Sequence, residues 1–284
     1  MLKKFVYFSF PLLIIFLVGC GLNTQSLKIK GSDTEVNLVL LLCEKFYEFD
    51  KHFSMSISGG GSGLGIASLL NGQADIANSS RPINSYEKKL FQQKNIELVE
   101  FEFAQDALVI IVNEKNNLDS IDSDELKLIL NGTIEYWNNT ENSKNKISVY
   151  GRQNNSGTHA YLKKKLNIEF SSHAKEMNGN AQIIEAIKSD PGGIGYVGAG
   201  YVIKDGRQSS SGYKILKLAE KKGMIAYSPL DPFAVKEKKY YLQRPLYQYI
   251  LKSSYTKAKR FLDFEQSKEG NKIILENGYF PIQY

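Results

Sequence analysis

The chain has 284 residues, enough for two domains of ordinary size, and 42% of them are hydrophobic and 23% charged. This balance excludes a disordered chain and a protein that crosses a membrane many times. A net charge of +6 does not by itself indicate a nucleic-acid-binding protein, and two cysteines with three histidines exclude a zinc-ribbon or disulfide scaffold.

The first twenty residues have the features of a bacterial lipoprotein signal. Two lysines precede the apolar stretch Phe5–Val18, which is shorter than the roughly 20 residues that a membrane-spanning helix needs. It ends in Leu17–Cys20 (Leu-Val-Gly-Cys), which resembles a lipobox, where the cysteine is lipidated and the chain is cut before it. A plain signal peptide with a chance cysteine is the alternative. We predict a signal peptide over 1–19, a tether over 20–26 with a lipid on Cys20, and a mature protein anchored to a bacterial membrane outside the cytoplasm, in the periplasm or at the cell surface.

Strand-like and helix-like segments alternate along the rest of the chain, which favours an α/β fold. The run Ala107–Asn113 is almost entirely apolar, as in a strand that is covered on both faces. The run Val39–Cys43 predicts that the second cysteine is a buried thiol. The expected strands are 27–30, 53–58, 74–77, 107–113, 147–150 and 194–202, and the expected helices are 36–49, 64–70, 85–93, 160–166 and 183–188.

Three loops, Gly31–Thr34, Gly59–Gly63 and Gly151–Thr158, each follow an expected strand and precede an expected helix. Each places glycine and small hydroxyl residues at a helix N-terminus, where unpaired backbone N–H groups and the positive end of the helix dipole attract anions. Plain N-capping is the alternative for any single loop. Three such loops, one of them with Arg152 four residues before a serine, favour a shared oxyanion.

A fourth segment, Ala74–Pro82, also ends an expected strand with hydroxyls and a guanidinium. Ser80 and Arg81 are therefore candidates for the site or its wall, although Arg81 is also explained as a surface charge.

Several motifs that suggest other chemistry do not fit their context. The Gly193–Gly198 segment matches G-x-G-x-x-G but lies in an expected strand instead of opening a helix, so it does not predict dinucleotide binding. Ser156 and His159 lack the presentation that a nucleophile and its base require. The histidines have no metal-ligand spacing, and Trp137 is expected in the core. We predict no catalytic residue, no metal and no cofactor.

Taken together and in order, the motifs resemble the phosphate-binding lipoproteins that supply phosphate-specific ABC transporters (PstS-like, class II periplasmic-type binding proteins). The resemblance covers nearly the whole mature chain. It rests on Gly31–Thr34, Gly61–Ile66, Ala74–Ile76 with Ser79–Arg81, Asp106–Asn113, Ile129–Gly132 with Trp137, Arg152 with Ser156–Thr158, Ile194–Val197, Arg244–Tyr247 and Asn277–Tyr279.

The resemblance implies two α/β lobes joined by two crossing strands, with the ligand held in the cleft between them. The first lobe would comprise 27–105 and 246–284, and the second 106–245. The resemblance also implies a monomer that captures inorganic phosphate, delivers it to a membrane ABC permease with its ATPase, and binds no nucleic acid. The predicted phosphate-binding residues, with Arg81 added from the residue pattern, are Ser32, Asp33, Thr34, Ser62, Ser80, Arg81, Arg152, Ser156, Gly157 and Thr158.

One departure concerns Ser80, because many members of the family have a carboxylate there that accepts the proton of phosphate. The acceptor in this chain would be Asp33, Asp106 or an oxygen lone pair of Ser80, and the position of Asp33 in an anion loop favours it. The alternatives for the function are a binder of another tetrahedral oxyanion (sulfate or molybdate), a secreted phosphohydrolase, and a surface adhesin that uses Lys163–Lys165.

Overall fold

The computed structural model describes residues 25–137, 145–205 and 207–282. The predicted signal peptide, the lipidation site Cys20 and most of the tether lie outside the described residues. Within the described part of the chain, no helix combines the length and the apolar character needed to cross a membrane.

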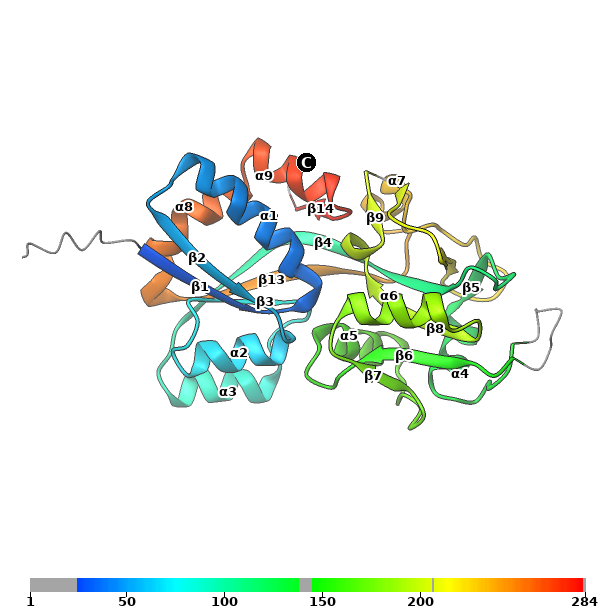
Figure 1. The fold of residues 1–284 in the computed structure, drawn as a ribbon. Helices are drawn as coiled ribbons and strands as arrows, with labels where there is room; N and C mark the ends of the chain where they lie inside the picture. Colours follow the sequence, from blue (N-terminus) through cyan, green and yellow to red (C-terminus); the bar gives the residue numbers. More distant parts are fainter. Residues whose placement is uncertain (1–24, 138–144, 206, 283–284) are drawn as a thin grey trace, which may run out of the picture.

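One curled, mixed sheet extends through the molecule, and helices cover it on both sides (Figure 1). Its main strand order is β2-β1-β3-β13-β4-β8-β6-β7, and two short strands, β11 and β14, also pair with β4. These strands are β1 (Gln25–Gly31), β2 (Phe53–Ser58), β3 (Ile76–Ser79), β4 (Leu98–Asn113), β6 (Ser148–Arg152), β7 (Lys175–Met177), β8 (Gly193–Gly198), β11 (Tyr213–Ile215), β13 (Gln243–Leu251) and β14 (Phe280–Pro281). The two-stranded sheets are β5 (Ser120–Asp122) with β12 (Lys217–Ala219), and β9 (Ile203–Lys204) with β10 (Arg207–Gln208). The α/β, two-lobed fold class is thereby confirmed.

In the half that contains the N-terminal strands, helices pack on both faces of β1, β2 and β3. One apolar core joins this sheet to α1, α8 and α9, and a second joins it to α2 and α3. Figure 1 shows these two helical layers above and below the strands. The helices are α1 (Asp33–Phe49), α2 (Ser62–Leu70), α3 (Ser85–Gln93), α8 (Tyr255–Glu265), preceded by the 3-10 turn η2 (Lys252–Ser254), and α9 (Lys268–Glu276).

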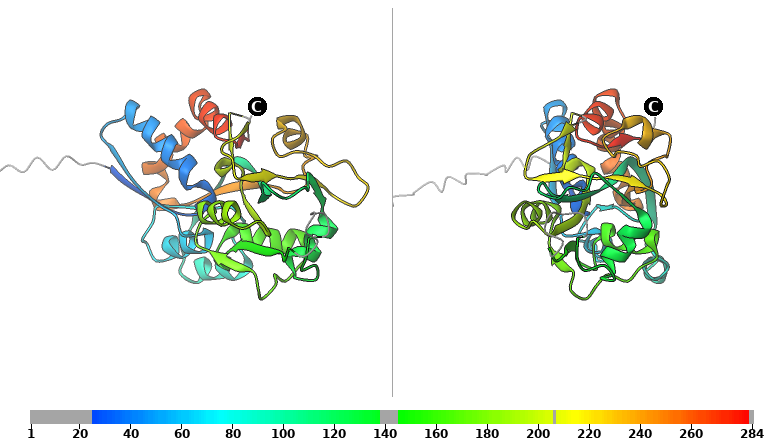
Figure 2. Two further views of the ribbon diagram at one scale, coloured as in Figure 1. Left: turned by 45° about the vertical axis from the view of Figure 1, so that its right-hand side comes forward. Right: turned by 90° about the vertical axis from the view of Figure 1, so that its right-hand side faces the viewer.

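The other half has a third core, in which β4, β6 and β8 pack against helices on both sides (Figure 2). Ile110 on β4, Ile194 on β8 and Ile183 on α6 are all essentially inaccessible to solvent. The helices of this half are α4 (Ser123–Leu130), α5 (Gly157–Leu166), α6 (Asn180–Ser189), the 3-10 turn η1 (Ala199–Tyr201) and α7 (Pro232–Lys236).

The long antiparallel strands β4 and β13 belong to both halves. On β4, Ala104 packs in the core with α1 and α8, whereas Ala107 packs in the core with α6. The pairing of β13 with β4 shifts register between Leu246 and Tyr247, where one residue of β4 is left without a partner in β13. Neighbouring parts of β4 therefore belong to the apolar cores of different halves. The lobe boundaries at 105/106 and 245/246 stay a prediction.

The differences from the expected elements occur at their ends. Helix α1 begins at Asp33 and not at 36, because its first turn is polar and hides the start of the periodicity. Strand β4 begins at Leu98, since Glu100 and Glu102 alternate with apolar residues. Strand β8 ends at Gly198 and not at 202, because η1 follows directly. The predicted burial of Cys43 and Trp137 is confirmed.

Candidate functional site

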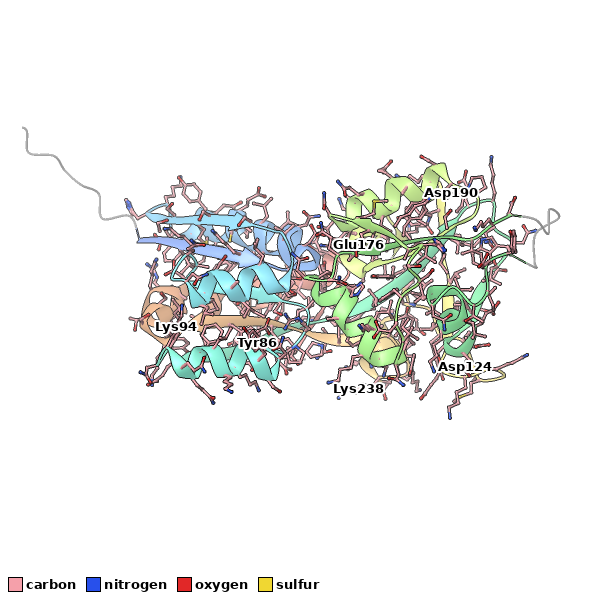
Figure 3. The ribbon with its side chains drawn as sticks, turned by 90° about the horizontal axis from the view of Figure 1, so that it is seen from below. Tyr86, Lys94, Asp124, Glu176, Asp190 and Lys238 are labelled. Carbon is pink, nitrogen blue, oxygen red and sulfur yellow. The ribbon has the colours of Figure 1, made fainter. Side chains whose placement is uncertain are left out.

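The N-termini of α1, α2 and α5 meet between the two halves. The backbone N–H of Gly61 donates to the carbonyl of Gly31, which joins the starts of α1 and α2. The N–H of Gly63 donates to the carbonyl of Asn155 at 3.0 Å, which joins α2 to the loop before α5. Figure 3 shows the two halves from below, with Tyr86 and Lys94 on one side and Glu176 and Asp190 on the other. Three positive helix ends therefore face one small region.

The local sequence explains why the backbones approach so closely. Gly31 has a φ of +135°, and a Cβ there would overlap the carbonyl of Asn78, which accepts the N–H of Ser32 at 2.9 Å. A Cβ on Gly157 would overlap the hydroxyl oxygens of Ser62 and Ser80. Glycine at these two positions is thus required for the termini to meet.

Hydroxyl groups from both halves surround this meeting point. The Oγ atoms of Ser62 and Ser80 are 3.4 Å apart, and the N–H of Ser80 donates to the Oγ of Ser62. The Oγ1 atoms of Thr34 and Thr158, one from each half, are 3.0 Å apart. All four residues are at most 1% exposed.

The N-capping alternative holds for one loop and fails for another. Ser156 caps α5, because its Oγ accepts from the backbone N–H groups of Thr158 and His159. Ser32 occupies the same position before α1 but makes no capping bond. Its Oγ is buried and has no hydrogen-bond partner among the described residues. Ser32 is therefore the hydroxyl that capping does not explain.

Arg152 and Asp33 form an ion pair between the two halves. The Nη1 of Arg152 donates to the Oδ2 of Asp33 at 2.9 Å, and its Nη2 donates to the carbonyl of Asn178. Asn180 also donates to this Oδ2 through its backbone N–H and its side-chain amide. The guanidinium is 1% exposed, and its Nε has no partner among the described residues. Asp33 thus accepts three bonds from the opposite half.

A second buried ion pair lies on the crossing strands and was missed at the sequence level. Arg244 on β13 and Asp106 on β4 are register partners, and the Nε and Nη2 of Arg244 donate to the Oδ2 of Asp106 at 3.1 and 2.9 Å. The same Nη2 donates to Thr158 and Thr34, whereas Nη1 has no partner in the described part of the chain. Burial raises the pKa of Asp106, and the charge of Arg244 opposes this rise. Opposite charges in two apolar crossing strands are the sequence signal that could have identified this pair.

Arg81 does not join these groups through its guanidinium. Its Nη1 and Nη2 donate to the two carboxylate oxygens of Glu87 on α3, at 2.8 and 2.7 Å. Arg81 lines a groove of about 840 Å³ between the halves, together with Ser80 and Arg244. Lys88, Lys164 and Lys165 also line it, so its mouth is basic.

His159 is not positioned as a base for Ser156. Its ring packs at a tilt against Phe170, with 4.4 Å between centroids, and its Nδ1 is 3.5 Å from the hydroxyl of Tyr196. Burial lowers the pKa of His159. Among residues 25–137, 145–205 and 207–282, no group of three or more His, Cys, Asp or Glu side chains has the geometry for a metal ion. The arrangement is one of fixed hydrogen-bond donors, which suits binding of an anion.

Comparisons with known proteins also indicate a similarity to anion-binding proteins. Residues 21–269 match the family model described as a PBP superfamily domain. The chain is 30% identical over 257 residues to the phosphate-binding protein PstS of Staphylococcus aureus (strain MRSA252), which covers 88% of this chain and 76% of that protein. It is 28% identical over 254 residues to the PstS of Staphylococcus haemolyticus, with the same coverage.

Two solved structures share the fold. One, from Clostridium perfringens, is assigned as a phosphate ABC transporter substrate-binding protein and contains bound phosphate. It superposes with a TM-score of 0.78 at 23% identity and covers 91% of this chain and 100% of its own. The other is an ABC-type phosphate transport receptor from Vibrio cholerae, with a TM-score of 0.68 at 24% identity over 89% of this chain and 99% of its own.

Proposed function

This chain belongs to the PBP superfamily and, within it, to the PstS-like phosphate-binding proteins, and we propose that it captures inorganic phosphate between its two lobes for a membrane ABC importer. Members of this family are solute-binding proteins and not enzymes as a rule. The observation that carries the proposal is the meeting of three helix N-termini from both halves around donors that have no hydrogen-bond partner in the described part of the chain. These donors are the Oγ of Ser32, the Nε of Arg152 and the Nη1 of Arg244.

The donors suit a compact, strongly hydrated anion, because each water that phosphate loses must be replaced by a fixed donor. A charge-assisted hydrogen bond contributes roughly 1.5–3 kcal/mol net. Micromolar affinity corresponds to about 8 kcal/mol, so a few such bonds with several neutral ones are sufficient after ordering costs. We assign the ligand contacts to the predicted residues Ser32, Thr34, Ser62, Ser80, Arg152, Ser156, Gly157 and Thr158 and add Arg244, with Asp33 orienting Arg152 and Arg81 in the wall of the groove.

Closure of the lobes follows from the origin of the donors. Those of α1 and α2 come from the proposed first lobe, 27–105 with 246–284, and those of α5 and Arg152 from the second, 106–245. An anion that bonds to both sets binds the closed form more tightly than an open one and therefore stabilises it. The permease would then recognise the closed, loaded form.

The cellular setting is the second part of the proposal. Relatives of this kind work outside the cytoplasm, and we assign to this chain a lipid on Cys20 after removal of residues 1–19. Two or more acyl chains are sufficient for stable attachment to a bilayer. The protein would act as an anchored monomer next to its permease.

Isothermal titration calorimetry of the full chain in detergent micelles, with phosphate, sulfate and molybdate in turn, tests the proposed ligand. We expect phosphate to bind with micromolar or better affinity and millimolar sulfate not to compete. Equal competition by sulfate or molybdate would reassign the protein to the general oxyanion binders. Absence of binding to all three would refute the proposal.

A further inference from the structure

Glu35 is a buried carboxyl directly behind the candidate site. It is the third residue of α1, three positions after Ser32, and its side chain is inaccessible to solvent. Neither of its oxygens has a hydrogen-bond partner among the described residues, and neither has the Oγ of Ser32. The Ser32 hydroxyl lies next to the carboxyl, and its influence opposes the rise in the pKa of Glu35, although the two form no hydrogen bond of ordinary length and angle here.

Among the residues that the structure describes, Glu35 has no ion-pair partner of its own. Arg244 on β13 attracts the ionised form, but its guanidinium is bonded to Asp106 on β4. Asp106 and Glu265 on α8 oppose ionisation, and the phenol of Tyr279, which donates to the carbonyl of Thr34, is a further titratable group near it. Burial raises the pKa of Glu35 well above its ordinary value.

A serine hydroxyl has one proton and two lone pairs, so its partner on one side decides what it offers on the other. A protonated Glu35 can donate to the Oγ of Ser32, which leaves the Ser32 proton for a bare oxygen of the ligand. An ionised Glu35 accepts a hydrogen bond from the Ser32 hydroxyl, and Ser32 then offers the ligand only lone pairs, which suit an oxygen that carries a proton. Asp33 and Asp106 cannot take this part as readily, because each is already bonded by a guanidinium.

We propose that Glu35 is a positioning residue that sets, through Ser32, whether the site accepts a bare or a protonated oxygen of its oxyanion. The inference rests on the proposed function and concerns its specificity. Near neutral pH sulfate carries no proton that it could donate, whereas hydrogen phosphate carries one. The preference for phosphate over sulfate therefore increases as Glu35 ionises and decreases as Glu35 takes up a proton.

The test compares, by calorimetry from about pH 5.5 to about pH 9, the dissociation constants of sulfate and of the hydrogen phosphate dianion, the latter corrected for the protonation of phosphate itself. A buried carboxyl of raised pKa titrates within this range. In the wild-type protein we expect the sulfate-to-phosphate ratio of dissociation constants to increase at least about tenfold across this range, the value of one lost hydrogen bond. In Glu35→Gln the ratio is expected to become independent of pH, because the amide does not titrate.

Glu265→Gln is the matched control. Glu265 is an equally buried carboxyl with a raised pKa, but it accepts from Gln248 and does not bond to Ser32. This variant should keep a pH-dependent ratio, with its midpoint shifted at most to lower pH because a charge that opposes the ionisation of Glu35 is removed. Ser32→Ala, which removes the intermediary and leaves the carboxyl, should lose it, and serves if Glu35→Gln does not fold.

A folded Glu35→Gln or Ser32→Ala variant with the wild-type pH dependence would overturn the inference. A wild-type protein that binds phosphate with a pH-independent ratio would also overturn it while leaving the proposed function intact. A wild-type protein that binds neither anion would instead refute the proposed function.

Discussion

The guanidinium of Arg152 links the candidate site to the opposite half, and its substitution tests the site at the level of one residue. Arg152→Ala should lose at least about tenfold in phosphate affinity, because it removes charge-assisted donors. Asp33 keeps two bonds from Asn180, so the melting temperature without ligand should change little. Calorimetry and differential scanning fluorimetry check the two parts. Unchanged affinity would exclude Arg152 from the site.

Substitution of Arg244, unlike that of Arg152, should lower the free energy of unfolding. Arg244→Met leaves Asp106 fully buried without its partner, which typically costs about 3–5 kcal/mol. Urea unfolding should show this loss, and the double variant Arg244→Met with Asp106→Leu should recover most of it. If the single variant is as stable as the wild type, the pair does not contribute as described.

Glu265 predicts a pH dependence of stability with a definite sign. Burial raises its pKa from 4.5 to about 8, and the bond from Gln248 only partly offsets this. A raised folded-state pKa means that stability is fully present below about pH 4.5 and decreases as the pH rises toward 8. Glu265→Gln should flatten this decrease, with a gain of at most about 5 kcal/mol above pH 8, in urea unfolding at several pH values. A wild-type stability that increases over this interval, and a variant that leaves it unaltered, would both contradict the prediction.

At the scale of elements, the close contact of α5 with α2 predicts that one methyl group prevents closure. Gly157→Ala would place its Cβ against the hydroxyls of Ser62 and Ser80, which belong to the other half. Phosphate affinity should therefore decrease at least tenfold, a cost of about 1.4 kcal/mol or more, while each half keeps its own packing. Gly59→Ala is the control, because its Cβ would meet only ordinary contacts beyond 3.6 Å. Equal affinities for the two variants would show that α5 and α2 do not meet in the bound form.

The elements also show what can be derived from a sequence and what cannot. Strand–loop–helix patterns locate α1, α2 and α5, since glycine and hydroxyl residues mark each helix start. Nothing local to those loops states that the three starts meet, because their contact depends on the pairing of β4 with β13. For the same reason the Arg244–Asp106 pair joins residues 138 positions apart and has no short motif. The role of Glu35 could not be predicted for a different reason. An acidic residue in the first turn of a helix is common, so its presence there does not indicate a functional site.

For the whole molecule, the bonds between the halves predict a change of shape on binding. Several of the contacts described above join one half to the other, among them Asp33 with Arg152 and Thr34 with Thr158. Saturating phosphate should decrease the radius of gyration measured by small-angle X-ray scattering. It should also increase the melting temperature, because a hundredfold excess of ligand over Kd adds about 2.7 kcal/mol to the free energy of unfolding. At the same phosphate concentration Gly157→Ala should not show the decrease in the radius of gyration, and it should be stabilised by at most about 1.4 kcal/mol, because its affinity is at least tenfold lower. Identical scattering with and without phosphate would contradict closure.

The register shift between Leu246 and Tyr247 has a consequence of a mechanical kind. Strands β4 and β13, with the register shift between them, are the main connection between the two halves. We therefore expect the relative orientation of the halves to be described by nearly one angle. Any substitution there that favours the parted arrangement by about 1.4 kcal/mol would weaken the apparent affinity nearly tenfold with every donor unaltered. The affinity of a binding protein of this kind can thus evolve through the conformational preference of its crossing strands, while the residues that contact the ligand stay the same.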